Sequence, residues 1–191
     1  MTIKPASAER LNAFSDGVFA VIITVLVLDL RAPTDGHWSA LFELWPVAIS
    51  YAASYLFVAI VWINHHHLMR FADLATPRLI WCNFGHLFTV SLLPFTTSWM
   101  AETSLSSVPV FAYAGAFALV NLSYIALMRE TMDRTAHPDV SATSRTAMHR
   151  RSSLTLAIFT LSGILALWHP YLGFGLVVCC LLTYLRPDTR L

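Results

Sequence analysis

The residue with the clearest chemical potential in this sequence is an aspartate inside the first apolar segment. Asp16 directly follows Phe14 and Ser15, and beyond Gly17 the run is apolar as far as residue 28 apart from Thr24. A carboxylate held within hydrocarbon costs roughly 2.5–3.5 kcal/mol on insertion scales, so it is a functional hypothesis by default and needs a partner. Asp16 is therefore the first candidate site residue.

Its partner is expected to come from another helix. Arg10 lies six residues before Asp16, which is about 240° around an ideal helix, so the two do not share a face. The second apolar segment ends in Trp62, Asn64 and the run His65-His66-His67, which offer indole, amide and imidazole donors. Two compatible roles stay open for Asp16: a clamp between packed helices, or a part of a transport site.

The first segment also carries an apolar stripe. Its members recur at spacings of four, three, four and three: Phe14, Val18, Val21, Val25 and Leu28. This period is typical of a packed helix seam, and it also suits a pore wall. Thr24 lies beside the stripe, where a membrane threonine usually bonds its own backbone.

Composition requires that these residues sit in a membrane protein. The chain has 191 residues, of which 57% are hydrophobic and only 12% charged, and its mean hydropathy is +0.62. Too few polar side chains exist to cover a water-facing surface. The expected fold is all-α, one domain over residues 1–191 with six transmembrane helices near 11–30, 44–63, 79–100, 108–128, 152–169 and 170–185. The last two are short and form either a tight hairpin or a re-entrant pair.

The basic residues predict the orientation. With six crossings, eleven of the twelve fall on the side of the termini, and only Arg31 falls opposite. The eleven are Lys4, Arg10, Arg70, Arg78, Arg129, Arg134, Arg145, Arg150, Arg151, Arg186 and Arg190. The positive-inside rule then places the termini, the loop 64–78 and a charged linker at 129–151 in the cytoplasm of a plasma-membrane protein. Asp29 is expected at an acidic outer side, which either concentrates cations at a mouth or is an ordinary set of screened surface carboxylates. The scattered positive charges argue against nucleic-acid binding.

Several other functions are weighed against the pattern. Eight histidines suggest a metalloenzyme, but they lack the paired clusters that such sites need, so neither a metal, a cofactor nor an enzyme activity is expected. The triplet His65–His67 is either a hydrogen-bonded helix end or a pH sensor. His86 is expected to bond a neighbouring helix, and a proton relay is the alternative. A proton-coupled secondary transporter using Asp16 and the triplet is the main rival, although inverted repeats are absent. A purely structural membrane subunit also stays open.

A resemblance favours a channel over a transporter. Arg10, three further residues, Phe14-Ser15-Asp16 and the run GVFAVIITVLVLDL resemble the signature of the transmembrane protein 175 family, which comprises potassium channels of lysosomes and bacteria. Trp62 with His65 and Phe71 resembles the end of that family's second helix. Asn83 and the segment SLLPFTTS at 91–98 resemble its third helix. The likeness covers the first three apolar segments, and the last three agree by hydropathy alone.

The resemblance implies a homotetramer, because the motif occurs once, with a pore lined by the first helix of each subunit. Potassium ions would pass a constriction at Val21, flanked by Thr24, Val25 and Leu28, with modest selectivity. Related channels tend to have isoleucine or leucine at the position of Val21, so a valine ring should be slightly wider. The remaining motif residues would brace this helix: Arg10, Phe14, Ser15, Asp16, Trp62, His65 and Asn83.

Overall fold

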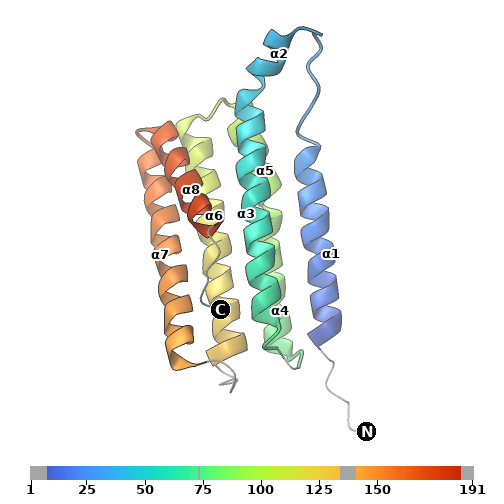
Figure 1. Ribbon diagram of the computed structural model, residues 1–191, viewed down its shortest axis with the longest axis vertical. Coiled ribbons are helices and arrows are strands. Elements are labelled where there is room, and N and C mark those ends of the chain that lie inside the picture. The colour runs from blue at the N-terminus through green and yellow to red at the C-terminus, as the bar shows by residue number, and fades with distance from the viewer. Residues whose placement is uncertain (1–7, 73, 134–140, 186–191) are drawn as a thin grey trace.

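The computed structural model describes residues 8–72, 74–133 and 141–185, and all of its long elements are helices (Figure 1). Lys4, Arg134, His137, Arg186 and Arg190 lie outside these ranges. The helices run roughly alongside one another: α1 Ala8–Val27, α2 Trp38–Glu43, α3 Trp45–Met69, α4 Pro77–Ser91, α5 Leu93–Glu102, α6 Ser107–Met128, α7 Ala142–Ala166 and α8 Pro170–Tyr184. The expected all-α class is confirmed.

Four stretches are long and apolar enough to cross a membrane: Ala8–Val27, Trp45–Met69, Pro77–Glu102 and Ser107–Asp133. They correspond to the first four expected segments. The chain is therefore a multi-pass membrane protein. The remaining two segments differ from these four, because α7 carries several arginines in its first half and α8 is apolar but only 15 residues long.

The third segment is two helices instead of one. A Thr76 side chain accepts from the Leu79 amide at 3.1 Å to start α4, and the helix stops at Ser91. Pro94 lies in the first turn of α5, where a proline is tolerated; inside one continuous helix it would remove a backbone hydrogen bond and clash with the carbonyl four residues before it. The break at residue 92 follows from this proline.

The linker expected at 129–151 is partly helical. A π-helical turn, Arg129–Asp133, extends α6, and α7 begins at Ala142 instead of at residue 152. The Ser141 hydroxyl accepts from the Ser144 amide at 3.0 Å and caps α7, as serine commonly does at this position. Helix α7 ends at Ala166, three residues before the end predicted for this segment.

The hairpin of α7 and α8 packs against α6 at the edge of the bundle farthest from α1 (Figure 1). Gly173 lets α8 approach α7 closely, since a Cβ at that position would lie 2.7 Å from the Ala166 Cβ and 2.8 Å from the Ser162 carbonyl oxygen. The Ser162 hydroxyl donates to the Gly173 carbonyl at 2.6 Å. Helix α8 returns only as far as Thr155, where the two hydroxyls of Thr155 and Tyr184 lie 2.6 Å apart.

The centre of the core is aromatic. Phe57 of α3 stacks on Phe117 of α6 with ring centroids 3.6 Å apart, and Phe159 of α7 meets both rings edge-on. Beside them, the buried Ser54 hydroxyl contacts both Thr97 at 2.7 Å and Tyr113 at 2.9 Å. This hydroxyl cluster joins α3, α5 and α6, so the interior is held by ring packing and by satisfied polar groups together.

Candidate functional site

Helix α1 has two unlike faces. Its buried face is made by residues at spacings of four, four, three and four: Leu11, Ser15, Phe19, Ile22 and Leu26. The four residues expected at the constriction lie on the opposite side and are exposed in the single chain: Val21, Thr24, Val25 and Leu28. Val21 is 60% and Leu28 72% exposed. The stripe predicted from the sequence is thus largely the exposed face, and a second, unremarked set of residues forms the packed seam.

The hydroxyl of Thr24 is engaged with its own helix. It donates to the Val21 carbonyl at 2.8 Å, which satisfies the proton and leaves the oxygen lone pairs available on the exposed face. Asp29 lies two residues beyond the end of α1 and is half-buried, and its carbonyl accepts from the Arg31 amide at 2.9 Å. In the chain, the exposed face of α1 is thus followed directly by Asp29.

Asp16 takes its hydrogen bond from a neighbouring helix. The Trp62 indole Nε1 of α3 donates to the Asp16 Oδ1 at 2.8 Å, and a bond to an ionised acceptor is worth about 1.5–3 kcal/mol. No ion pair joins Arg10 to Asp16 within the described part of the chain, and Arg10 is exposed. The indole, one of the donor types considered from the sequence, thus fills the role.

A second tie, one residue earlier on α1, is fully buried. The Asn83 amide nitrogen of α4 donates to the Ser15 hydroxyl at 2.9 Å, and the Asn83 amide oxygen accepts from the His65 Nε2 of α3 at 2.7 Å. Ser15 in turn donates to the Leu11 carbonyl at 2.9 Å. The acceptor at Asn83 requires that His65 carry its proton on Nε2. Three helices are joined here through a chain in which each group is satisfied.

Phe14 also reaches a neighbour, although half of its surface is exposed. Its ring lies 5.3 Å from that of Phe84 on α4. On the buried side, Phe19 packs at the same centroid distance against His65. The motif residues Phe14, Ser15 and Asp16 therefore contact three different partners on α4 and α3.

The three histidines of the triplet differ in burial. Only His65 is buried, whereas His66 and His67 are exposed, and His66 packs 5.6 Å from the Trp62 ring. Asn64, considered as a partner for Asp16, instead accepts from the Tyr124 hydroxyl through its backbone carbonyl at 3.5 Å. The structure thus brings Asp16 together with Trp62, and separately Ser15 with His65.

A further cluster of polar side chains lies next to His65. His86 of α4 is fully buried, its ring is parallel to that of His65 at 5.8 Å, and its Nδ1 lies 2.9 Å from the Ser123 hydroxyl of α6. The expected bond from His86 to a neighbouring helix is confirmed. Thr89, whose hydroxyl lies 2.8 Å from that of Ser123, completes the group. Ser123 and Thr89 gave no signal in the sequence, because isolated hydroxyls are common in membrane helices.

Possible metal ligands do not cluster in the described part of the chain. In residues 8–72, 74–133 and 141–185, no group of three or more His, Cys, Asp or Glu side chains could hold a metal ion. Asp133 instead pairs with His149 at 3.0 Å and lies 3.8 Å from Arg145, beyond the end of α6.

Comparisons with known proteins point to one family. Residues 10–94 match the family described as "Endosomal/lysosomal potassium channel TMEM175". A potassium channel of a Chryseobacterium species is 29% identical over 95% of this chain and 94% of its own length. One of Streptomyces collinus is 33% identical over 76% of this chain and 75% of its own.

The fold agrees with these sequence relatives. The crystal structure of a lysosomal potassium-selective channel TMEM175 homolog from Chamaesiphon minutus superposes with a TM-score of 0.81, covering 93% of this chain and 95% of that one at 24% identity. The matched family is one of ion channels and not of enzymes. The signature in α1, its ties to α3 and α4, and these relatives together show that the chain belongs to the TMEM175 family.

Proposed function

We propose that this protein is a potassium channel, a homotetramer in which the α1 helices of four subunits line a central pore. The observation that carries the proposal is the exposed apolar face of α1, which holds Val21 and Leu28 and lies opposite the buried face. Helix α1 is at one edge of the bundle (Figure 1), so four copies can bring this face together without disturbing any packing inside a subunit. Relatives at 29% and 33% identity are named potassium channels, which supports the permeant ion.

The constriction would be a ring of Val21 side chains, with Thr24, Val25 and Leu28 extending the lining. Apolar rings gate by dewetting, and a ring of hydroxyl oxygens replaces part of the hydration shell of an ion. Thr24 suits the second role, because its proton is used by the Val21 carbonyl and its oxygen remains an acceptor. The chain has no threonine-valine-glycine-tyrosine-glycine filter, so the proposed selectivity is modest. Asp29 would concentrate cations at the outer mouth.

The ties to α3 and α4 would position the lining helix. Trp62 holds Asp16 and Asn83 holds Ser15, so a displacement of α1 along or around its axis breaks bonds on two neighbours at once. Phe14 and His65 add ring contacts at the same level. In this proposal the network acts on the ion path only through the placement of α1.

The proposed topology has six crossings, with α7 and α8 as the last two and both termini in the cytoplasm of a cell whose plasma membrane holds the channel. Its support is the distribution of basic residues, of which only Arg31 falls on the outer side. Each subunit of the tetramer would consist of one domain, residues 1–191. Within the described residues, the short α8 would cross only with a locally thin bilayer or with snorkelling side chains at its end.

Recording from the purified full chain in planar bilayers tests the proposal. With potassium on one side and sodium on the other, we expect a steady current at fixed concentrations whose reversal potential favours potassium. Saturable uptake that needs a proton gradient and gives no such current would instead support a carrier built on Asp16 and the His65–His67 triplet. Cross-linking in the same membranes should end at four subunits, and a monomer or dimer would contradict the assembly.

A further inference from the structure

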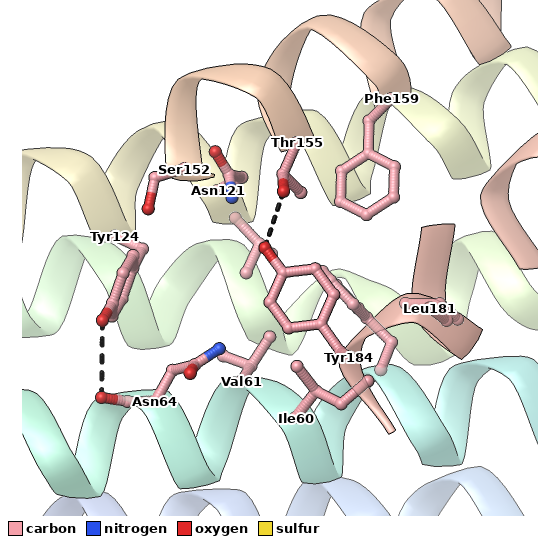
Figure 2. Close-up of a pocket in the computed structure, with 12 residues that line it drawn as sticks. Ile60, Val61, Asn64, Asn121, Tyr124, Ser152, Thr155, Phe159, Leu181 and Tyr184 are labelled. Carbon is pink, nitrogen blue, oxygen red and sulfur yellow. Dashed lines mark hydrogen bonds between the residues drawn. The ribbon is translucent and has the colours of Figure 1, made fainter. Parts of the chain in front are cut away.

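A mixed polar and apolar pocket lies between α3, α6, α7 and α8 (Figure 2). Its polar lining comes from six residues: Asn64, Asn121, Tyr124, Ser152, Thr155 and Tyr184. Apolar side chains such as Ile60, Val61 and Leu181 line the rest. The pocket is partly open, and it lies where α8 ends and α7 continues past it.

Protein partners satisfy only part of this polar lining. Tyr124 donates to the Asn64 carbonyl, and Thr155 and Tyr184 share a hydrogen bond, both drawn in Figure 2. The Asn121 side-chain oxygen is buried and has no hydrogen-bond partner among the described residues. A buried amide oxygen without a donor costs about 1–3 kcal/mol. An occupant that donates a hydrogen bond to the Asn121 oxygen would therefore remove this cost.

One cation, Arg151, lies beside the pocket, against the ring of the lining residue Tyr184. Arg151 of α7 places its guanidinium carbon 4.2 Å from the centre of the Tyr184 ring, and none of the described residues that line the pocket is acidic. A guanidinium has five donors in a fork that matches phosphate, so it can keep contacts within the protein and still bind a phosphate oxygen. The occupant should carry an anionic group next to its hydrogen-bond donor.

The short hairpin sets the depth at which such a group is found. Helix α8 has 15 residues, or about 22 Å at 1.5 Å per residue, against ~30 Å for the hydrocarbon core. In a six-crossing subunit, the early end of α8 leaves the adjoining part of α7 without α8 beside it, and lipid headgroups that reach inward there would meet Arg151 and Tyr184. Basic pockets between membrane helices are known binding places for anionic headgroups.

The size of the cavity restricts what enters. The cavity volume is about 40 Å³, which is room for about three water molecules. That volume suits the hydroxyl-bearing end of a headgroup and excludes a whole lipid. The apolar lining at Ile60 and Leu181 continues the surface along which the acyl chains would lie.

We propose that this pocket binds the headgroup of an anionic phospholipid of the phosphatidylglycerol type. The phosphate pairs with Arg151, and a headgroup hydroxyl donates to the Asn121 oxygen. The pocket lies among α3, α6, α7 and α8, and α7 and α8 form the edge of the bundle farthest from α1 (Figure 1), which would face lipid in the proposed tetramer. The binding itself depends on no ion current, so it can fail or succeed independently of the channel proposal.

The test uses the purified, delipidated full chain and counts retained lipid by native mass spectrometry. With matched acyl chains, we expect phosphatidylglycerol to be retained about fivefold over phosphatidylcholine, the effect of about 1 kcal/mol for one arginine near an anionic lipid. Arg151→Gln should remove this preference. Arg150→Gln, its exposed neighbour on α7, is the matched control and should keep it, and Arg151→Lys should keep most of it.

Two further measurements separate the possible occupants. Asn121→Leu should lower retention of phosphatidylglycerol more than that of phosphatidic acid, which lacks the headgroup hydroxyls. Millimolar inorganic phosphate should not displace the lipid; displacement would show a simple anion site and overturn the lipid assignment. Equal retention by Arg151→Gln and Arg150→Gln, with both variants folded by circular dichroism, would also overturn it and leave a cavity that holds water only.

Discussion

Two regions of the bundle are built differently. Around α6, α7 and α8, rings and backbones are in close contact, as Phe117 against Phe57 and Gly173 against Ala166 show. Helix α1 instead buries one narrow face and leaves the other open, and hydrogen bonds at Ser15 and Asp16 hold it in place. The difference teaches that folding of the subunit depends mainly on the first region, whereas the proposed ion path uses a surface that one subunit alone leaves unpacked.

The largest effect on stability is expected in the aromatic core. Phe117→Ala removes a fully buried ring that contacts Phe57, Tyr113 and Phe159, and should lower the free energy of unfolding by about 3–5 kcal/mol. Denaturant unfolding in detergent micelles measures the loss. Phe88→Ala, at a ring that is 66% exposed, serves as the control. Comparable losses in the two variants would contradict the assignment of stability to this region.

The close approach of α7 and α8 should be the next most sensitive. Gly173→Ala places a methyl group 2.7–2.9 Å from Ala166 and the Ser162 carbonyl, and such overpacking costs typically about 1–3 kcal/mol. Gly175→Ala is a matched control, since nothing lies within 4 Å of its Cβ position. It should be neutral or stabilise by up to about 1 kcal/mol through helix propensity. Thermal unfolding of the two variants measures this difference in stability, and equal melting temperatures would refute the close contact.

In the other region, Asp16→Asn should act on assembly. The variant keeps an acceptor for the Trp62 indole but loses the charge, which weakens the bond by about 1 kcal/mol. We expect fewer tetramers in size-exclusion chromatography, with subunit helicity unchanged. If the variant instead forms a stable tetramer with altered gating, the role of Asp16 in ion passage is direct and not structural.

The smallest effect on stability, and the clearest on current, is expected at Val21. This side chain is 60% exposed in the single chain, so Val21→Ala should change the unfolding free energy by less than about 0.5 kcal/mol. In bilayer recordings, both Val21→Ala and Val21→Asn should raise conductance and weaken the preference for potassium over sodium. Val27→Ala, exposed on a different side of α1, is the control. Unchanged currents would remove Val21 from the constriction.

The membrane class and the order of the segments were predictable from the sequence, because apolar runs of about 20 residues are typical of helices that span the hydrocarbon core. So was the need of Asp16 for a donor from another helix. The break in the third segment follows from Pro94, and α7 begins at Ala142, inside the stretch expected to be a charged linker. The composition of that stretch, with charged residues such as Arg145, is typical of a linker. A helix that extends beyond the membrane also tolerates such charges.

The sequence by itself therefore determined that this protein is helical and lies in a membrane, and its motif in α1 indicated the family. Only the tertiary structure decided which donor reaches Asp16, which histidine is buried, and which face of α1 is left open. Hydropathy depends on composition along the chain, whereas each of these choices depends on how helices far apart in sequence are rotated against one another. That rotation is set by side-chain packing, as at Phe57 and Phe117, and no single segment contains it.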